Sequence, residues 1–155
     1  MGRELNGICG SLQVSQNHSP IHYVDTSLLS QPSVRGQMTM YRDGTWYLLT
    51  PKQVPEDVVD RLDASVLQNQ LLSPLLGIHN PRTDTRIQFV GGNRGPEALK
   101  KAVNGDSALA FHMFPTGIDQ LLDVAEANRL MPPKSTWFEP KLRGGVLIHS
   151  FDANE

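Results

Sequence analysis

A β-hairpin in the first third of the chain is the sequence feature that most restricts its fold. Residues 37–42 (QMTMYR) and 45–50 (TWYLLT) are rich in side chains that favour strands, and Asp43-Gly44 stands between them. Two residues of this kind form a primed turn, whose twist matches that of the strands it joins. The sequence therefore predicts two antiparallel strands connected by a two-residue turn.

The second half of the chain alternates predicted strands with predicted helices. Strands are expected at residues 87–90 (IQFV), 107–113 (SALAFHM) and 146–151 (VLIHSF). One helix should begin at Pro96 and end at Gly105, and a capping box of Thr116 and Asp119 should begin a second. Because such alternation favours right-handed crossovers, we expect an α/β (or α+β) fold with a mixed, largely parallel sheet of strand-helix repeats after the N-terminal β-hairpin.

Apolar residues at helical spacing predict which helix faces are buried. A helix capped by Asp63 should run to residue 72 and end before Pro74. Its buried residues are expected to be Val66, Leu67 and Leu71. The helix after Thr116 is expected to bury a single face made of Ile118, Leu121, Leu122 and Ala125.

The composition of the N-terminal segment differs from that of the rest. Residues 8–35 are rich in Ser, Gln, Asn and Pro and show neither the strand nor the helix period. We expect residues 1–35 to be a loosely ordered lead-in and residues 36–155 to form a single α/β domain, a size that allows a useful core.

Charge and hydropathy exclude several classes of partner. The net charge is −2, so no global positive field draws the chain to nucleic acid or to an anionic membrane. No run of about 18 apolar residues is present, so we expect no membrane span. A single cysteine excludes an internal disulfide framework, and a cytoplasmic location fits best.

The sequence predicts neither a metal site nor a cofactor. The five histidines have no metal-ligand spacing, and no cysteine pair assists them. The glycine-rich stretch GGNRGP at residues 91–96 has the spacing of neither a dinucleotide fingerprint nor a phosphate-binding P-loop. We therefore expect no metal and no cofactor.

The segment of residues 131–145, MPPKSTWFEPKLRGG, is the strongest candidate for a ligand-facing element. Its paired prolines prevent a helix and favour an extended backbone. Its polar side chains therefore need partners outside a local helix. Cations beside hydroxyls can grip a phosphate or a carboxylate. The candidate anion-binding residues of this segment are Lys134, Ser135, Thr136, Lys141 and Arg143.

Two further loops carry candidate anion ligands. Arg94 lies in GGNRGP, between a predicted strand and a helix start, where free backbone N–H groups favour an anion. In HNPRTDTR, residues 79–86, Arg82 and Asp84 are candidates, because Asp84 stands between two arginines and could orient either of them. Each loop also has a purely structural alternative. GGNRGP could be a tight turn that needs glycine, and HNPRTDTR could be an ion-paired turn.

Trp137 and Phe138 support a second reading of the same segment. In that reading the chain is a non-catalytic interaction or structural module that docks through these two aromatic side chains. They could equally pin a long connection to the core, with Pro140 as a rigid corner and the cations merely solvated.

Two long stretches of the chain resemble a known family. They are LQNQLLSPLLGIHNPRTDTRIQFVGGNRGPEAL and ALAFHMFPTGIDQLLDVAEANRLMPPKSTWFEPKLRGGVLIHSF, within a match over about residues 36–151. They resemble the C-terminal part of the bacterial and archaeal family catalogued as domain of unknown function 1015. Asn80 stands where that family usually has Asp, and Gly144 where it more often has Ser or Asp.

The resemblance implies a function that this chain shares with a missing partner segment. Full-length members have a large N-terminal portion with a motif similar to that of free serine kinases, and members often accompany serine-biosynthesis genes. This implies phosphoryl chemistry on serine or phosphoserine, as phosphotransfer or as phosphatase activity. We expect the chain, as a fragment or a truncated relative, to be inactive alone and to contribute an anion-binding surface to a site that the N-terminal portion completes.

Overall fold

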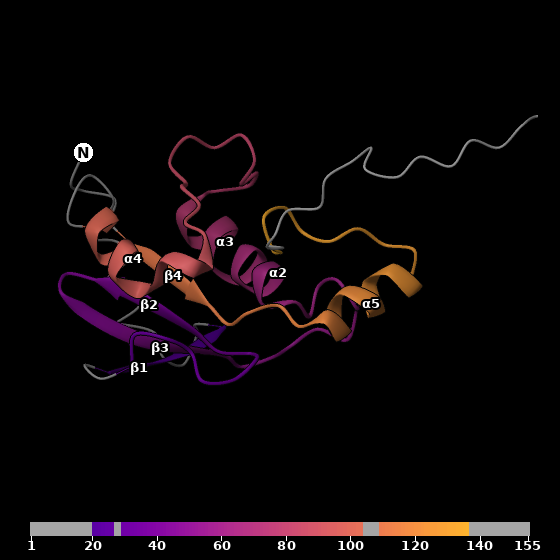
Figure 1. Ribbon diagram of the computed structural model, residues 1–155, viewed down its shortest axis with the longest axis horizontal. Coiled ribbons are helices and arrows are strands. Elements are labelled where there is room, and N and C mark those ends of the chain that lie inside the picture. Colours follow the sequence, from indigo (N-terminus) through magenta and orange to yellow (C-terminus); the bar gives the residue numbers. More distant parts are fainter. Residues whose placement is uncertain (1–19, 27–28, 104–108, 137–155) are drawn as a thin grey trace, which may run out of the picture.

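The computed structural model describes residues 20–26, 29–103 and 109–136, and within them a four-stranded sheet is flanked by helices (Figure 1). The strands are β1 (Ile21–Asp25), β2 (Met38–Arg42), β3 (Thr45–Pro51) and β4 (Ala110–Met113). The helical segments are α2 (Asp63–Leu67), the π-helix η1 (Gln68–Leu72), α3 (Ser73–Leu76), the 3₁₀ turn η2 (Gly92–Arg94), α4 (Gly95–Val103) and α5 (Ile118–Glu126).

The predicted hairpin is confirmed and lies at the centre of the sheet. β2 and β3 pair antiparallel, with Arg42 opposite Thr45 next to the turn. Asp43 and Gly44 both have positive φ, 48° and 85°. Two consecutive residues of this conformation are what a type I′ turn requires, and Asp-Gly accepts it at low cost.

The expectation of a largely parallel sheet is wrong. The strand order is β1-β3-β2-β4, and every described neighbouring pair is antiparallel, so the fold is α+β. The connection between β3 and β4 does return the chain so that β4 runs in the same direction as β3. However, β1 occupies the free edge of β3, so β4 pairs with β2, whose direction is opposite.

The three strands predicted in the second half of the chain have different outcomes. Residues 87–90 form no strand, and two of them, Ile87 and Phe89, line the pocket described below. The strand expected at residues 107–113 is confirmed for Ala110–Met113. Residues 146–151 lie outside the described residues.

The expectation of a loosely ordered lead-in is wrong for β1. This strand pairs with β3 along its whole length, from Ile21 opposite Pro51 to Asp25 opposite Tyr47. The side chain of Ile21 is buried in the core. The five residues IHYVD lie between polar segments. Such a short stretch does not predict a strand by itself, because strand formation depends on pairing with β3.

Residues 63–76 form one continuous helical run, α2-η1-α3, whose predicted buried residues Val66, Leu67 and Leu71 are confirmed. Its predicted ends are wrong. The N-cap is Leu62, while the Asp63 carboxylate accepts the backbone N–H of Gly36 at 3.1 Å. Pro74 lies in the first turn of α3, just after the wider π turn, where a missing N–H costs little. The run ends only where Gly77 turns left-handed.

The sheet has an apolar cluster on each face. Met38, Met40 and Leu49 pack with Val66 and Leu71 of the helical run. Because successive side chains of a strand point to opposite faces, Tyr41 belongs to the other face, where it clusters with Trp46 and Ala110. Leu99 and Val103 of α4 pack against that second cluster.

The buried face predicted for α5 is wrong. Gln120 and Val124 are buried, whereas Ile118 and Leu122 are 64% and 54% exposed. Asp119 and Asp123, one turn apart on the outer side of the helix, form exposed ion pairs with Arg35 (2.7 Å) and Arg61 (2.6 Å). The adjacent positions 120 and 124 face inward, so the ion pairs accompany this orientation, although exposed pairs are too weak to impose it alone.

The predicted cap of α5 also differs. Gly117 is the N-cap, and its N–H donates to the side-chain oxygen of Gln120 at 3.1 Å. The hydroxyl of Thr116, expected to cap the helix, instead donates to the carbonyl of Ser135 at 2.7 Å. Thr116 therefore ties the start of α5 to the segment that contains Lys134.

Candidate functional site

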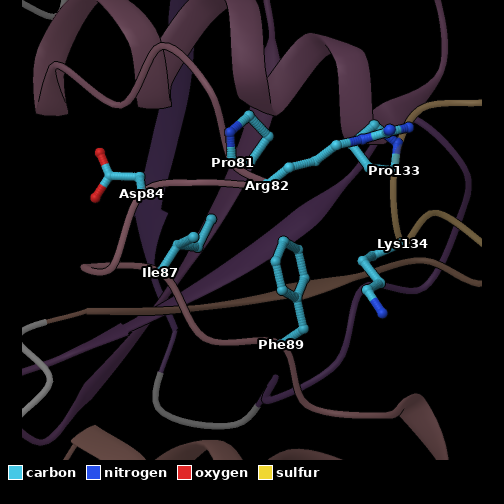
Figure 2. A pocket seen from close by; sticks show the side chains of 7 residues that line it. All are labelled: Pro81, Arg82, Asp84, Ile87, Phe89, Pro133 and Lys134. Carbon is cyan, nitrogen blue, oxygen red and sulfur yellow. The ribbon is translucent and has the colours of Figure 1, made fainter.

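A pocket of about 510 Å³ lies between the loop that follows α3 and the turn that follows α5 (Figure 2). The first loop contributes Pro81, Arg82, Asp84, Ile87 and Phe89. The second contributes Pro133 and Lys134. Three residues that the sequence indicated separately as anion-site candidates, Arg82, Asp84 and Lys134, are thus brought to one pocket.

Asn80 shapes the first loop. Its side-chain oxygen accepts the backbone N–H of Arg82 at 3.0 Å, and its carbonyl accepts the N–H groups of Thr83 and Asp84. This is the local bonding that makes Asn-Pro a strong turn former. The turn fixes the backbone from which Arg82 projects.

Asp84 and Arg86 fasten the end of that loop to α3. The guanidinium of Arg86 contacts both carboxylate oxygens of Asp84, at 2.6 and 3.0 Å. It also donates to the carbonyls of Leu76 and Gly77, at 3.1 and 3.0 Å. A cation at a helix C-terminus satisfies carbonyls that have no partner within the helix. Arg86 therefore caps α3 and holds the loop at the same time.

The role of Asp84 follows from these contacts. The hydrogen bond from the Arg86 side chain lowers the pKa of the Asp84 carboxyl to about 2, so it is ionised at neutral pH. Of its two flanking arginines it binds Arg86, and in Figure 2 its carboxylate points away from the guanidinium of Arg82. Asp84 thus positions the loop and does not hold the pocket arginine.

The second side of the pocket is a tight turn with a strained centre. The N–H of Ser135 donates to the carbonyl of Pro132 at 3.4 Å, and its hydroxyl donates to the same carbonyl at 2.7 Å. Lys134, in the centre of the turn, has a φ of 59°, a conformation that side chains other than glycine and asparagine seldom adopt. The chain accepts this strain at a residue that lines the pocket.

The two cations of the pocket are available to a ligand. Neither the guanidinium of Arg82 nor the ammonium of Lys134 has a hydrogen bond or ion pair with any described residue. Both residues are exposed. In Figure 2 the side chain of Arg82 extends toward Pro133, whereas the ammonium of Lys134 points the other way, and the ring of Phe89 lies below Arg82 and beside Lys134.

The remaining predicted site residues lie elsewhere. Ser135 and Thr136 follow Lys134 but do not line the pocket, and the Ser135 hydroxyl is used within the turn. Arg94, exposed in η2, does not line it either. Lys141 and Arg143, like Trp137 and Phe138 of the docking hypothesis, lie outside the described residues.

Two pocket residues, Ile87 and Phe89, were not predicted as part of a site. Both were assigned to a buried strand on the strength of the apolar run IQFV. Their spacing of two residues, with polar Gln88 between them, is the signal that could have identified a single apolar side. Ile87 packs against the core cluster of the helical run, whereas Phe89 is 51% exposed.

Within the described ranges, no three His, Cys, Asp or Glu side chains gather closely enough to hold a metal ion. None of the helices in the described part of the chain combines the length and the apolar character that crossing a membrane requires. The chain matches no protein-family model, no curated protein and no solved structure.

Proposed function

We propose that this chain is an anion-binding module whose pocket holds a small phosphorylated or carboxylate ligand through Arg82 and Lys134. The observation that carries the proposal is that two exposed cations, without partners among the described residues, line one pocket. Arg offers a planar fork of donors to a phosphate or carboxylate, and Lys offers a compact positive charge. The strained backbone of Lys134 supports the same role.

The proposed module supplies binding and not a complete catalytic site. Among the described residues, Asp84 is the one carboxylate that lines the pocket, and it is ionised and bound to Arg86. A general base needs a pKa near the working pH, so a carboxyl with a pKa of about 2 is poorly suited to the role. The proposal therefore includes a second segment, the N-terminal portion of the resembled family, that completes the site.

The class of reaction in this proposal comes from the family resemblance. It is phosphoryl chemistry on serine or phosphoserine in the cytoplasm, to which this chain contributes the cationic wall. Lys141 and Arg143, which follow in the same cationic segment of the sequence, stay candidate ligands of the same anion on sequence grounds. Stabilisation of phosphoryl oxygens by positioned cations is the contribution such a wall makes to phosphoryl transfer.

Anion-dependent thermal stabilisation tests the proposal. A ligand that binds only the folded state at ten times its Kd stabilises it by about 1.4 kcal/mol. Unfolding of the purified chain is followed by circular dichroism with increasing inorganic phosphate, at constant ionic strength. The wild-type chain should be stabilised, and Arg82→Ala and Lys134→Ala should each lose most of the effect.

Lys101→Ala is the matched control. Lys101 is exposed on α4, outside the pocket, and its replacement removes the same single positive charge. It should respond to phosphate as the wild-type chain does. Equal losses in all three variants would mean that phosphate acts through overall charge, and the proposed site would be abandoned.

A further inference from the structure

The pocket is divided into a cationic end and an apolar wall. Arg82 and Lys134 supply the charge, while Ile87 and Phe89 supply apolar surface. Figure 2 shows Phe89 with its ring turned into the pocket, below Pro81 and beside Lys134. An anion bound at the cations would therefore have an apolar surface next to it.

Phe89 has no evident task in holding the fold together. It belongs to neither of the apolar clusters that the described residues form, and half of its surface is exposed. Ile87, its neighbour on the wall, does pack against the core and so anchors the segment. Ile87 thus holds the segment in place, and the ring of Phe89 stays open toward the pocket. A flat group can stack on such a ring.

The volume of the pocket also favours an organic ligand over an inorganic anion. Its volume of about 510 Å³ lies within the range of sites that hold organic ligands, about 300–1,000 Å³. A water molecule accounts for roughly 30 Å³ of liquid, so an inorganic phosphate would leave most of this space unfilled. The pocket therefore has room for a ligand with a second part beyond its anionic group.

We propose that the pocket binds an anion carried on a planar aromatic group, with the phosphate or carboxylate at Arg82 and Lys134 and the ring on Phe89. The inference rests on the proposed binding of an anion by Arg82 and Lys134, and not on the serine chemistry that the family resemblance implies, and it adds the chemistry of the rest of the ligand. Aryl phosphates and nucleoside monophosphates share this chemistry. Stacking of a base on an aromatic side chain strengthens single-stranded nucleic-acid binding, and for a half-exposed ring we expect an effect at the lower end of the known range, about tenfold.

Isothermal titration of the wild-type chain with three phosphate monoesters tests the inference. Phenyl phosphate should bind about tenfold more tightly than methyl phosphate, and O-phosphoserine, which has no ring, should bind like methyl phosphate. Adenosine monophosphate is the fourth ligand and separates the two sources: tighter binding than phenyl phosphate would identify a nucleotide, and weaker binding a simple aryl anion.

Phe89 variants assign the effect to the ring. Phe89→Ala should remove the tenfold preference for phenyl phosphate and leave methyl phosphate binding unchanged. Phe89→Leu, which keeps an apolar side chain but no ring face, should lose most of the preference too. The exposure of Phe89 makes both variants compatible with folding, and circular dichroism checks this.

The failures of the two proposals are distinguishable. If methyl and phenyl phosphate bind equally, and both depend on Arg82 and Lys134, the aromatic inference is wrong and the anion site stands. If Phe89→Ala weakens both ligands equally, the ring serves the fold and the inference is again wrong. If no phosphate monoester binds, the anion site itself is wrong and the inference falls with it.

Discussion

The carboxylate of Asp84 and the guanidinium of Arg86 are joined at 2.6 Å in the loop that presents Arg82 to the pocket. The same guanidinium reaches the carbonyls of Leu76 and Gly77 at the end of α3. A single ion pair therefore links the end of a core helix to the backbone of the proposed anion site. Breaking it should affect both stability and the site.

Replacement of Asp84 by Asn should lower the melting temperature in a pH-dependent way. The pKa of Asp84 is lowered from 3.8 to about 2 in the folded chain by Arg86, so its ionised form favours folding. That contribution is fully present above pH 4 and is lost as the pH falls toward 2. The difference in melting temperature between wild type and Asp84→Asn should thus be largest at neutral pH and shrink over this window.

Asp60→Asn is the control for that experiment, because Asp60 is exposed and its carboxylate forms no hydrogen bond or ion pair with any described residue. It removes the same charge and should leave the melting temperature nearly unchanged at every pH. A destabilisation by Asp84→Asn that stays constant from pH 7 to pH 2 would contradict the ion-pair explanation.

Lys134→Gly should separate stability from binding. A left-handed residue other than glycine carries a cost of about 1–2 kcal/mol, and glycine adds roughly 0.5–1 kcal/mol of backbone entropy. The variant should therefore be as stable as the wild type or more stable by up to about 1 kcal/mol. It should nevertheless lose the stabilisation that phosphate provides, because the ammonium is gone.

Lys134→Ala completes this comparison, since it also removes the charge but keeps a Cβ at a φ of 59°. Chemical denaturation should find it less stable than Lys134→Gly by about 1 kcal/mol, with the same loss of phosphate response. If the glycine variant were the less stable of the two, the left-handed turn at Lys134 would be refuted.

The purified chain should not turn over phosphoesters by itself. The described pocket offers two cations and one carboxylate, and that carboxylate is bound to Arg86. Release of inorganic phosphate from O-phosphoserine and from phenyl phosphate is the measurement, with the Arg82→Ala variant as a control for a contaminating phosphatase. Hydrolysis that disappears in that variant would show that the chain holds a complete site.

Local chemistry decided which parts of the fold could be predicted. The hairpin follows from Asp43-Gly44, two residues whose backbone preference determines the turn without any help from distant segments. The sheet order does not follow from local signals, because it depends on the pairing of β1 with β3 and of β4 with β2, which are distant in the sequence. Local patterns carry little information about such long-range pairing.

The candidate site was predictable in its parts and not in its assembly. Arg82 and Lys134 were each predicted from the charge and turn chemistry of a short loop, and the tertiary fold alone determines that the two loops face one pocket. Phe89 was misassigned because a short apolar run is typical both of a buried strand and of an apolar pocket wall. Exposure, which the sequence does not contain, distinguishes the two.

The orientation of α5 gives the last prediction. Val124 is 1% exposed and Leu122 is 54% exposed, whereas the apolar spacing predicts that Leu122 is buried. Val124→Ala removes two buried methyl groups and should cost about 2 kcal/mol of unfolding free energy. Leu122→Ala should change it by less than about 0.5 kcal/mol, as surface substitutions do. Urea denaturation of both variants measures the difference in unfolding free energy. A larger loss for Leu122→Ala would mean that α5 packs through its apolar face. Asp119 and Asp123 would then be turned away from Arg35 and Arg61.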